Sequence, residues 1–292
     1  MRDIDRDTIT AAVVAACGPE TTPRVRALLE GAVTHLHDYI RAVQPTHAEW
    51  RAVIGFLTRA GAITTEERNE FVLASDVLGV SSLIDMVNSA PGATESSVLG
   101  PFHVRGAPEL PVGGDLIGDN PGEPVVVSGH VRDTQGNAVP HAVLEIWQTA
   151  ANGLYSNQDE NQSAYNLRAR MRTGADGRYA FTTIRPEPYS VPDDGPVGDL
   201  LRATGRRAWR PSHLHVIVEA EGFRSVVTEL FPADDPYLDR DAVFGVRASL
   251  VIPFQPQTDA GTLPDDIAAR AWLKGPFSRV DFDFVLGRAA AG

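Results

Sequence analysis

Apolar residues recur at helical spacing through the first third of the chain. After Thr22-Pro23, where a capping residue precedes a proline, they predict a long amphipathic helix and fall three and four positions apart: Val25, Leu28, Leu29, Val33, Leu36, Ile40 and Val43. Thr46-x-x-Glu49 and Thr64-x-x-Glu67 have the form of capping boxes and predict the starts of two further helices. A shorter apolar run over residues 9–17 predicts a first helix that stops at Gly18.

The pattern changes after Ala90-Pro91-Gly92-Ala93, which breaks the helical spacing. Short runs rich in β-branched and aromatic residues follow, with turn-forming stretches between them; they cover residues 125–131, 142–147, 179–182, 226–231 and 248–252. Short strands at this spacing are typical of an antiparallel β-sandwich. We therefore predict an α+β chain, with a helical region over residues 1–92 and an antiparallel β-sandwich domain over residues 93–292.

The charge balance limits the kind of partner. A net charge of −12 and an isoelectric point near 5.1 argue against nucleic acid, because phosphate binding needs a basic face. Cys17 is the only cysteine and can form no internal disulfide, which favours a reducing compartment. The apolar run over residues 9–17 is too short to span a membrane and follows acidic residues, unlike a secretion signal. We expect a cytoplasmic protein without a membrane span.

The candidate chemistry begins with His213 and His215. Two histidines at positions i and i+2 of a strand point to the same side, while Leu214, Val216 and Val218 fill the other. One metal ion could then bind both imidazoles. A pair of histidines on a solvated strand face explains the same spacing, so further ligands decide between the two interpretations.

Histidine and cysteine offer no further ligand downstream, since none follows His215 and Cys17 lies far upstream. Glu219 is a carboxylate four residues after His215. Tyr155 and Tyr189 both occur in turn-forming settings before the histidines. A phenolate is a hard, anionic oxygen donor that suits Fe(III), and two phenolates with two neutral imidazoles would balance the ferric charge.

With these residues in place, the chain resembles the intradiol ring-cleavage dioxygenases, non-haem Fe(III) enzymes that split catechols between their hydroxyl-bearing carbons. The family pattern stands here, in order, as Gly153-Leu154-Tyr155, Pro188-Tyr189-Ser190-Val191-Pro192 and Arg210-Pro211-Ser212-His213-Leu214-His215. The segments most similar to the hydroxyquinol-cleaving members are residues 95–102, 194–201, 203–206 and 241–246. The resemblance covers nearly the whole chain, including the helical region.

The resemblance implies a site of one Fe(III) per chain held by Tyr155, Tyr189, His213 and His215. It further implies that Tyr189 leaves the metal as the substrate arrives and accepts a substrate proton, while Tyr155 stays bound. Arg210 would stabilise charge on the ring, although a surface ion pair is the alternative for this residue. Glu229 stands where catechol-cleaving relatives usually carry Gln, and we expect it to affect protonation at the site.

The resemblance also implies a substrate pocket and a partner. The predicted pocket residues, in addition to Arg210, are Leu73, Asp76, Val98, Leu99, Gly100, Pro101, Phe102, Val191, Pro192 and Val243. Asp76 interrupts an apolar helical stretch: it lies either on a solvated face or near the extra hydroxyl of a triol. The family suggests a homodimer through the N-terminal helices, with an apolar channel between them that can hold a phospholipid.

The resemblance implies cleavage of hydroxyquinol with O2 to 3-hydroxy-cis,cis-muconate, which tautomerises to maleylacetate. Cleavage of catechol or a chlorocatechol is the alternative within the family. A different class stays open as well, because Ser128-Gly129 with residues 136–140 resembles transthyretin-like sandwich modules that only bind partners. Such a module has no need of four metal donors, and it would be colourless, whereas tyrosinate bound to Fe(III) gives a red-brown protein.

Overall fold

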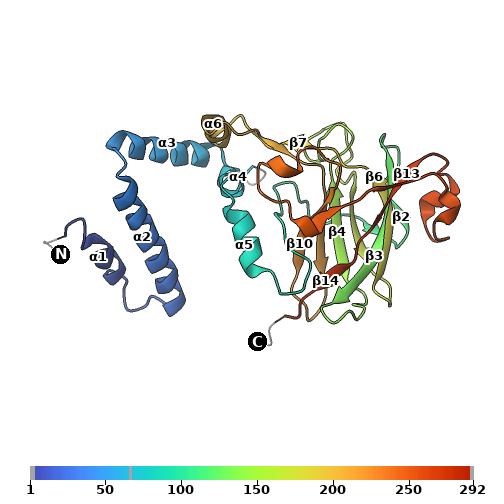
Figure 1. The fold of residues 1–292 in the computed structure, drawn as a ribbon, viewed down its shortest axis with the longest axis horizontal. Coiled ribbons are helices and arrows are strands. Elements are labelled where there is room, and N and C mark those ends of the chain that lie inside the picture. The colour runs from blue at the N-terminus through green and yellow to red at the C-terminus, as the bar shows by residue number, and fades with distance from the viewer. Residues whose placement is uncertain (1–3, 66–67, 290–292) are drawn as a thin grey trace. The chain divides into compact units, whose positions relative to one another are not determined.

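The computed structural model describes residues 4–65 and 68–289, and the contacts between residues divide the chain into two units between Arg59 and Ala60 (Figure 1). The predicted boundary between residues 92 and 93 lies where helices give way to strands, since the fifth helix ends at Asn88 and the first strand begins at Glu109. Two short helices therefore belong to the same compact unit as the sheets.

Helices make up the first unit, as the apolar spacing predicts. They are α1 (Ile9–Ala15), α2 (Pro23–Val43) and the start of α3 (His47–Ile63). The Thr22 side chain caps α2 by accepting from the backbone N–H of Val25. At the start of α3 the Glu49 carboxylate accepts from the Thr46 N–H and the Thr46 hydroxyl accepts from the Glu49 N–H, so the predicted capping box is confirmed.

The second predicted capping box is not the start of the next helix. Glu67 lies outside the described residues, and α4 (Glu70–Val77) begins only at Glu70, where the Asn69 side chain accepts from two backbone N–H groups. The Thr64 hydroxyl instead donates to the Ala60 carbonyl at the end of α3. Gly79, with φ +71°, separates α4 from α5 (Val80–Asn88), and α4 also packs against α6 (Pro196–Ala203).

Two sheets face each other in the second unit. The first has the strand order β1-β5-β4-β9-β10-β11, and its strands are β1 (Glu109–Leu110), β4 (Val143–Gln148), β5 (Arg168–Arg172), β9 (Leu214–Glu219), β10 (Val226–Pro232) and β11 (Val251–Ile252). The second has the order β12-β13-β3-β6-β2 with β14 also paired to β3; its strands are β2 (Gly114–Asp115), β3 (Pro124–Asp133), β6 (Arg178–Ile184), β12 (Gln255–Gln257), β13 (Phe277–Asp281) and β14 (Phe284–Leu286).

The α+β class is confirmed, but the sheets are mixed rather than strictly antiparallel. The long neighbours pair antiparallel, whereas β1, β2, β11, β13 and β14 each pair parallel to a neighbour. Residues 248–252, predicted as one strand, form a turn of 3-10 helix (Ala248–Leu250) before the two-residue β11. The remaining short elements are β7 (Tyr189–Ser190), β8 (Trp209–Arg210) and 3-10 turns at Leu238–Arg240, Ala260–Thr262 and Ala268–Ala271.

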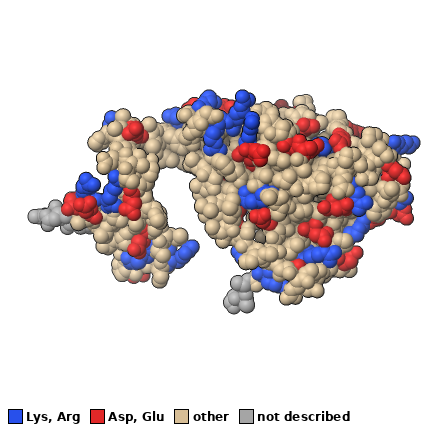
Figure 2. All heavy atoms as spheres, viewed as in Figure 1, with Lys and Arg blue, Asp and Glu red and all other residues tan. Residues whose placement is uncertain are grey.

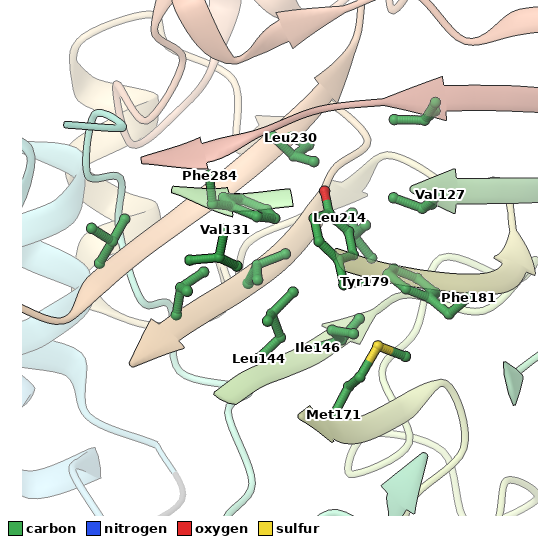
Figure 3. Packing of buried hydrophobic residues seen from close by; sticks show 14 of the residues in the cluster. Val127, Val131, Leu144, Ile146, Met171, Tyr179, Phe181, Leu214, Leu230 and Phe284 are labelled. Carbon is green, nitrogen blue, oxygen red and sulfur yellow. The ribbon is translucent and has the colours of Figure 1, made fainter. Parts of the chain in front are cut away.

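The hydrophobic core lies between the two sheets. Leu144, Ile146 and Met171 of the first sheet face Val127 and Phe181 of the second (Figure 3). The inward residues of β9 are Leu214, Val216 and Val218, all buried in this core, as predicted. Because side chains alternate along a strand, His215 must point to the opposite, outer face of the first sheet.

The visible surface carries acidic and basic side chains interspersed over the sandwich (Figure 2). Apolar side chains of α2 remain exposed, among them Leu28 and Leu36 at 55% and 56% of their area. Within residues 4–65 and 68–289, no helix combines the length and apolar character needed to cross a bilayer.

Candidate metal centre

Strand register brings the central residues of the site together. His215 on β9 lies directly opposite Trp147 on β4 and Glu229 on β10. Direct neighbours across strands share a face, so all three project from the outer face of the first sheet. The Trp147 indole stacks on the His215 imidazole with ring centroids 4.5 Å apart and planes 8° from parallel. This contact fixes the plane of the His215 ring.

The two histidines point their Nε2 atoms at each other, 3.0 Å apart. His213 Nδ1 lies 2.7 Å from the Pro211 carbonyl oxygen, which can only accept a hydrogen bond. Nδ1 therefore carries the proton, and Nε2 presents a lone pair to the centre of the site. Gly100, with φ +69°, packs beside the same pair, since a Cβ there would lie 3.5 Å from His215 Cε1.

Both predicted tyrosines reach this pair of histidines. Tyr155, in the loop after β4, has its hydroxyl 3.2 Å from His213 Nε2. Tyr189 on β7 lies opposite Arg210 on β8, and its ring approaches the Tyr155 ring edge-on at 5.4 Å. Phe102 stacks on Tyr155 at 4.7 Å and meets Tyr189 at 5.8 Å, so it packs both phenol rings in place.

Arg210 is buried among carboxylates rather than on the surface. Its Nη1 lies 2.8 Å from Glu229 Oε1, and its Nε lies 3.1 Å from Asp241 Oδ1. The Nη1 atom is also 3.4 Å from His213 Nε2, so the guanidinium borders the candidate metal ligands. Arg210 lies three residues before His213, a spacing that would place the two on opposite faces of a regular strand. The structure nevertheless brings Arg210 to the site, because β8 ends at Arg210 and Pro211 follows it.

The pKa values of Glu229 and His213 both lie below their ordinary values. Burial alone would raise the pKa of Glu229, but the Arg210 charge, with hydrogen bonds from Arg210 and Ser97, lowers it below its ordinary value. Burial, with the nearby Arg210 charge, lowers the pKa of His213 to about 4. At neutral pH, His213 is therefore neutral and able to bind a metal.

The phenols behave differently from the imidazoles. Burial raises the pKa of Tyr155 and of Tyr189, in each case against the lowering effect of Arg210. A bound cation of high charge is thus required for either to ionise at neutral pH. Two neutral imidazoles and two phenols that ionise only on metal binding are a donor set that fits a hard, trivalent ion.

Among the described residues, Glu229 also clusters with His213 and His215, with donor atoms within 4.8 Å of one another. Glu229 Oε2 accepts hydrogen bonds from Ser97 and Arg210, whereas Glu229 Oε1 lies 2.8 Å from Arg210 Nη1 but has no hydrogen-bond partner. The Tyr155 hydroxyl lies closer to His213 than the Glu229 carboxylate does, at 3.2 Å against 3.4 Å. Glu219, at the far end of β9, is exposed and takes no part in this cluster.

A cavity of about 110 Å³ lies in the same unit. Predicted pocket residues line it, namely Leu73, Asp76, Pro101, Phe102 and Pro192, together with Arg68, Asn69, Glu70 and Val72, which were not predicted. Asp76 is only 4% exposed, and this burial raises its pKa, against the lowering effects of Ser81 and Arg210. Its placement therefore excludes the solvated helix face.

The other predicted pocket residues lie apart from this cavity lining. Val98, Val191 and Val243 are buried, Leu99 is 43% exposed, and Gly100 packs against His215. Sequence reasoning missed Trp147, Ser97 and Asp241, which contact His215, Glu229 and Arg210. Strand alternation places Trp147 on the face opposite to the core residues Leu144 and Ile146, but its contact with His215 depends on the register of β4 with β9.

Sequence reasoning also missed Arg168, on β5. Its Nε donates to Ser156 Oγ at 2.7 Å, its Nη2 donates to Asn157 Oδ1 at 2.9 Å, and its Cζ lies 5.9 Å from the centre of the Tyr155 ring. Burial lowers the pKa of Arg168 to about 10, and the charge of Tyr155 acts against this shift.

Comparison with known proteins identifies the family to which this fold belongs. Residues 22–95 match the family model described as "Catechol dioxygenase N terminus", and residues 100–287 match the model described as "Dioxygenase". The chain belongs to the intradiol ring-cleavage dioxygenase family.

Among its relatives, the hydroxyquinol 1,2-dioxygenase of a Rhizobium species is 46% identical over 91% of this chain and 90% of its own. The hydroxyquinol 1,2-dioxygenase of Nocardioides simplex is 48% identical over 91% of this chain and 90% of its own. A solved structure of hydroxyquinol 1,2-dioxygenase from Pseudomonas putida is 40% identical, with a TM-score of 0.88, covering 97% of this chain and 99% of that one.

Proposed function

We propose that the protein is an Fe(III)-dependent dioxygenase that cleaves hydroxyquinol with O2 to 3-hydroxy-cis,cis-muconate, and hence to maleylacetate. The observation that carries this proposal is that the Tyr155 hydroxyl and His215 Nε2 converge on His213 Nε2, at 3.2 Å and 3.0 Å. Two relatives named hydroxyquinol 1,2-dioxygenase, 46% and 48% identical to the chain, support the choice of substrate.

Tyr155, Tyr189, His213 and His215 would hold one Fe(III) per chain. When bound, ferric iron supplies a Lewis acid that binds the doubly deprotonated diol and draws electron density from its ring. The two phenolates offset most of the ferric charge, and the neutral imidazoles add none. The protein's own part is to keep both imidazoles unprotonated, as burial and the Arg210 charge do for His213.

The residues around the metal have separate tasks in this proposal. Tyr189 takes one substrate proton on its phenolate oxygen, which lies 3.5 Å from Arg210 Nη1. Arg210 stabilises negative charge that develops on the substrate ring. Glu229 and Asp241 hold the Arg210 guanidinium in this position through the ion pairs described above. Tyr189, Arg210, Glu229 and Asp241 are all buried, and this burial would keep water away from the substrate ring.

Asp76 would select the triol. A buried carboxylate that lines the cavity can accept a hydrogen bond from the third hydroxyl of hydroxyquinol. Catechol lacks that hydroxyl and would leave Asp76 without this additional hydrogen bond, which is costly in a buried site. Leu73, Pro101, Phe102 and Pro192 would pack against the ring, with Val98, Leu99, Gly100, Val191 and Val243 behind or beside them.

Oxygen uptake measured side by side with hydroxyquinol, catechol and 4-chlorocatechol tests the proposal. The iron-loaded protein should consume O2 fastest with hydroxyquinol and form maleylacetate. A preference for catechol or a chlorocatechol would move the protein to another branch of its family. No uptake with any diol would favour a binding module.

We further propose a cytoplasmic homodimer. The exposed apolar face of α2 supports an interface through the N-terminal helices, and the family resemblance extends this to a phospholipid in an apolar channel there. A single free cysteine, Cys17, supports a reducing compartment.

A further inference from the structure

Arg168 is a buried arginine with only neutral hydrogen-bond partners. Its side chain, 2% exposed, donates to Ser156 and Asn157, and its Nη1 atom has no hydrogen-bond partner. In the described part of the chain, no carboxylate lies within ion-pair distance of it. Because arginine stays charged and an unpaired buried charge is costly, this position calls for a negative partner that forms in the functional state.

The group that Arg168 faces is Tyr155. Its guanidinium carbon lies 5.9 Å from the centre of the Tyr155 ring, and its partner Ser156 is the next residue along the chain. Strand register fixes this placement, because Arg168 on β5 lies directly opposite Trp147 on β4, which in turn stacks on His215. The backbone ladder thus places Arg168 beside the metal-binding residues rather than leaving its position to a flexible loop.

Arg210, the other buried cation near the site, is already neutralised. One guanidinium there contacts two carboxylates, Glu229 and Asp241. Arg168 is therefore the buried guanidinium near the phenols whose charge no carboxylate offsets.

We propose that Arg168 is a positioning residue that supplies the counter-charge for the Tyr155 phenolate in the iron-loaded protein. The inference rests on the proposed ferric site. A fixed positive charge beside the ring attracts the anionic phenolate of the iron-loaded protein, and so helps Tyr155 retain the metal. The same charge lowers the energy of the phenolate electrons, so charge transfer from Tyr155 to Fe(III) absorbs at shorter wavelength than it would without Arg168.

The visible spectrum and the iron retention of the holoprotein test this role. Arg168→Met removes the charge, and Arg168→Gln removes it while keeping an amide that can donate to Ser156 or Asn157. Both should move the tyrosinate band to longer wavelength. Both should also lose iron to a chelator about 10- to 100-fold more readily, as expected for a guanidinium whose carbon lies 5.9 Å from the centre of the phenolate ring.

Two variants serve as matched controls. Arg168→Lys keeps the charge, and its band should stay near that of the wild type. Arg170→Met removes a guanidinium two residues along the same strand that already pairs with Glu109, and it should change neither the band nor the iron retention.

An iron-loaded Arg168→Gln variant with an unmoved band and unchanged retention would overturn the inference and leave Arg168 with a packing role only. Should the Met variant fail to fold, the Gln variant decides. Should both fail, a band shift in Arg168→Lys would overturn the inference, and an unshifted band would support it. A wild-type protein that holds no ferric iron would instead refute the proposed function itself, before any variant is compared.

Discussion

Arg210 and Glu229 form a buried ion pair, with Arg210 Nη1 2.8 Å from Glu229 Oε1 and neither side chain more than 2% exposed. Glu229 also accepts from the Ser97 hydroxyl, so the pair is held from two sides. Removing one charge of a buried pair leaves the other poorly compensated, although Asp241 still contacts Arg210.

Glu229→Gln should therefore lower the free energy of unfolding by roughly 1–3 kcal/mol, the usual cost of a weakened buried polar contact. Urea unfolding would measure this change. Glu219→Gln removes an exposed carboxylate from the neighbouring strand and should have almost no effect. Equal stability of the two variants would mean that Glu229 does not hold Arg210 in place.

Asp76→Asn should reduce kcat/KM for hydroxyquinol more than for catechol. The difference should be about 1–3 kcal/mol in transition-state stabilisation, because only the triol has a hydroxyl that needs the Asp76 carboxylate. Steady-state kinetics with both substrates would measure it. Ser81→Ala is the control, since it alters a hydrogen-bond partner of Asp76 and keeps the carboxylate. Equal losses on both substrates would make Asp76 structural.

Asp85 provides a pH-dependent test of stability. Burial raises the pKa of this carboxyl from 3.8 to about 6, against the opposing charge of Arg247. A carboxyl with a raised pKa in the folded state stabilises the fold at low pH, and this contribution is lost as the pH rises through about 6. Asp85→Asn should therefore raise the melting temperature at pH 7.5 and have little effect at pH 4.

The matched control for Asp85 is Asp119→Asn, which changes an exposed aspartate in the same unit. Its effect on the melting temperature should be small and the same at both pH values. A stabilisation by Asp85→Asn that does not depend on pH would show that the charge of Asp85 is not its cause.

The proposed dimer makes a prediction about α2. Leu36 and Ile40 are exposed apolar residues on one side of this helix, 56% and 44% exposed. Leu36→Lys with Ile40→Lys should convert a dimer to a monomer, as measured by light scattering at micromolar concentration. Ala27→Lys places one lysine on the opposite side of α2 and should leave the dimer intact. A wild-type protein that is already monomeric would contradict the proposal.

The sequence predicts elements best where local chemistry decides them. Thr22-Pro23 and the Thr46–Glu49 box mark helix starts through contacts within one turn, and both appear as predicted. The start of α4 at Glu70 could not be predicted, because Thr64 and Asn69 are both suitable N-cap residues in the sequence. The structure uses Asn69 as the cap, and the Thr64 hydroxyl donates to the Ala60 carbonyl instead. The parallel pairing of β1, β2, β11, β13 and β14 depends on distant partners, which local patterning does not encode.

The candidate site likewise contains residues that the local sequence predicts and residues that only strand pairing brings together. The motif spacing carries Tyr155, Tyr189, His213 and His215, and the structure brings Tyr155 and the two histidines within hydrogen-bond distance and packs the Tyr189 ring against them. Trp147 and Arg168 join them only through the register of β4 with β5 and β9. A single sequence does not reveal strand register, so these two residues, which support the ligands from behind, could be found only in the structure.

The visible spectrum of the purified iron-loaded protein, read together with its iron content, tests the ferric site most directly. We predict one iron per chain and a red-brown tyrosinate-to-iron band, both lost in His215→Ala because the remaining donors no longer enclose the ion. A colourless wild-type protein that cleaves hydroxyquinol at full rate with zinc, or with no metal at all, would contradict the account.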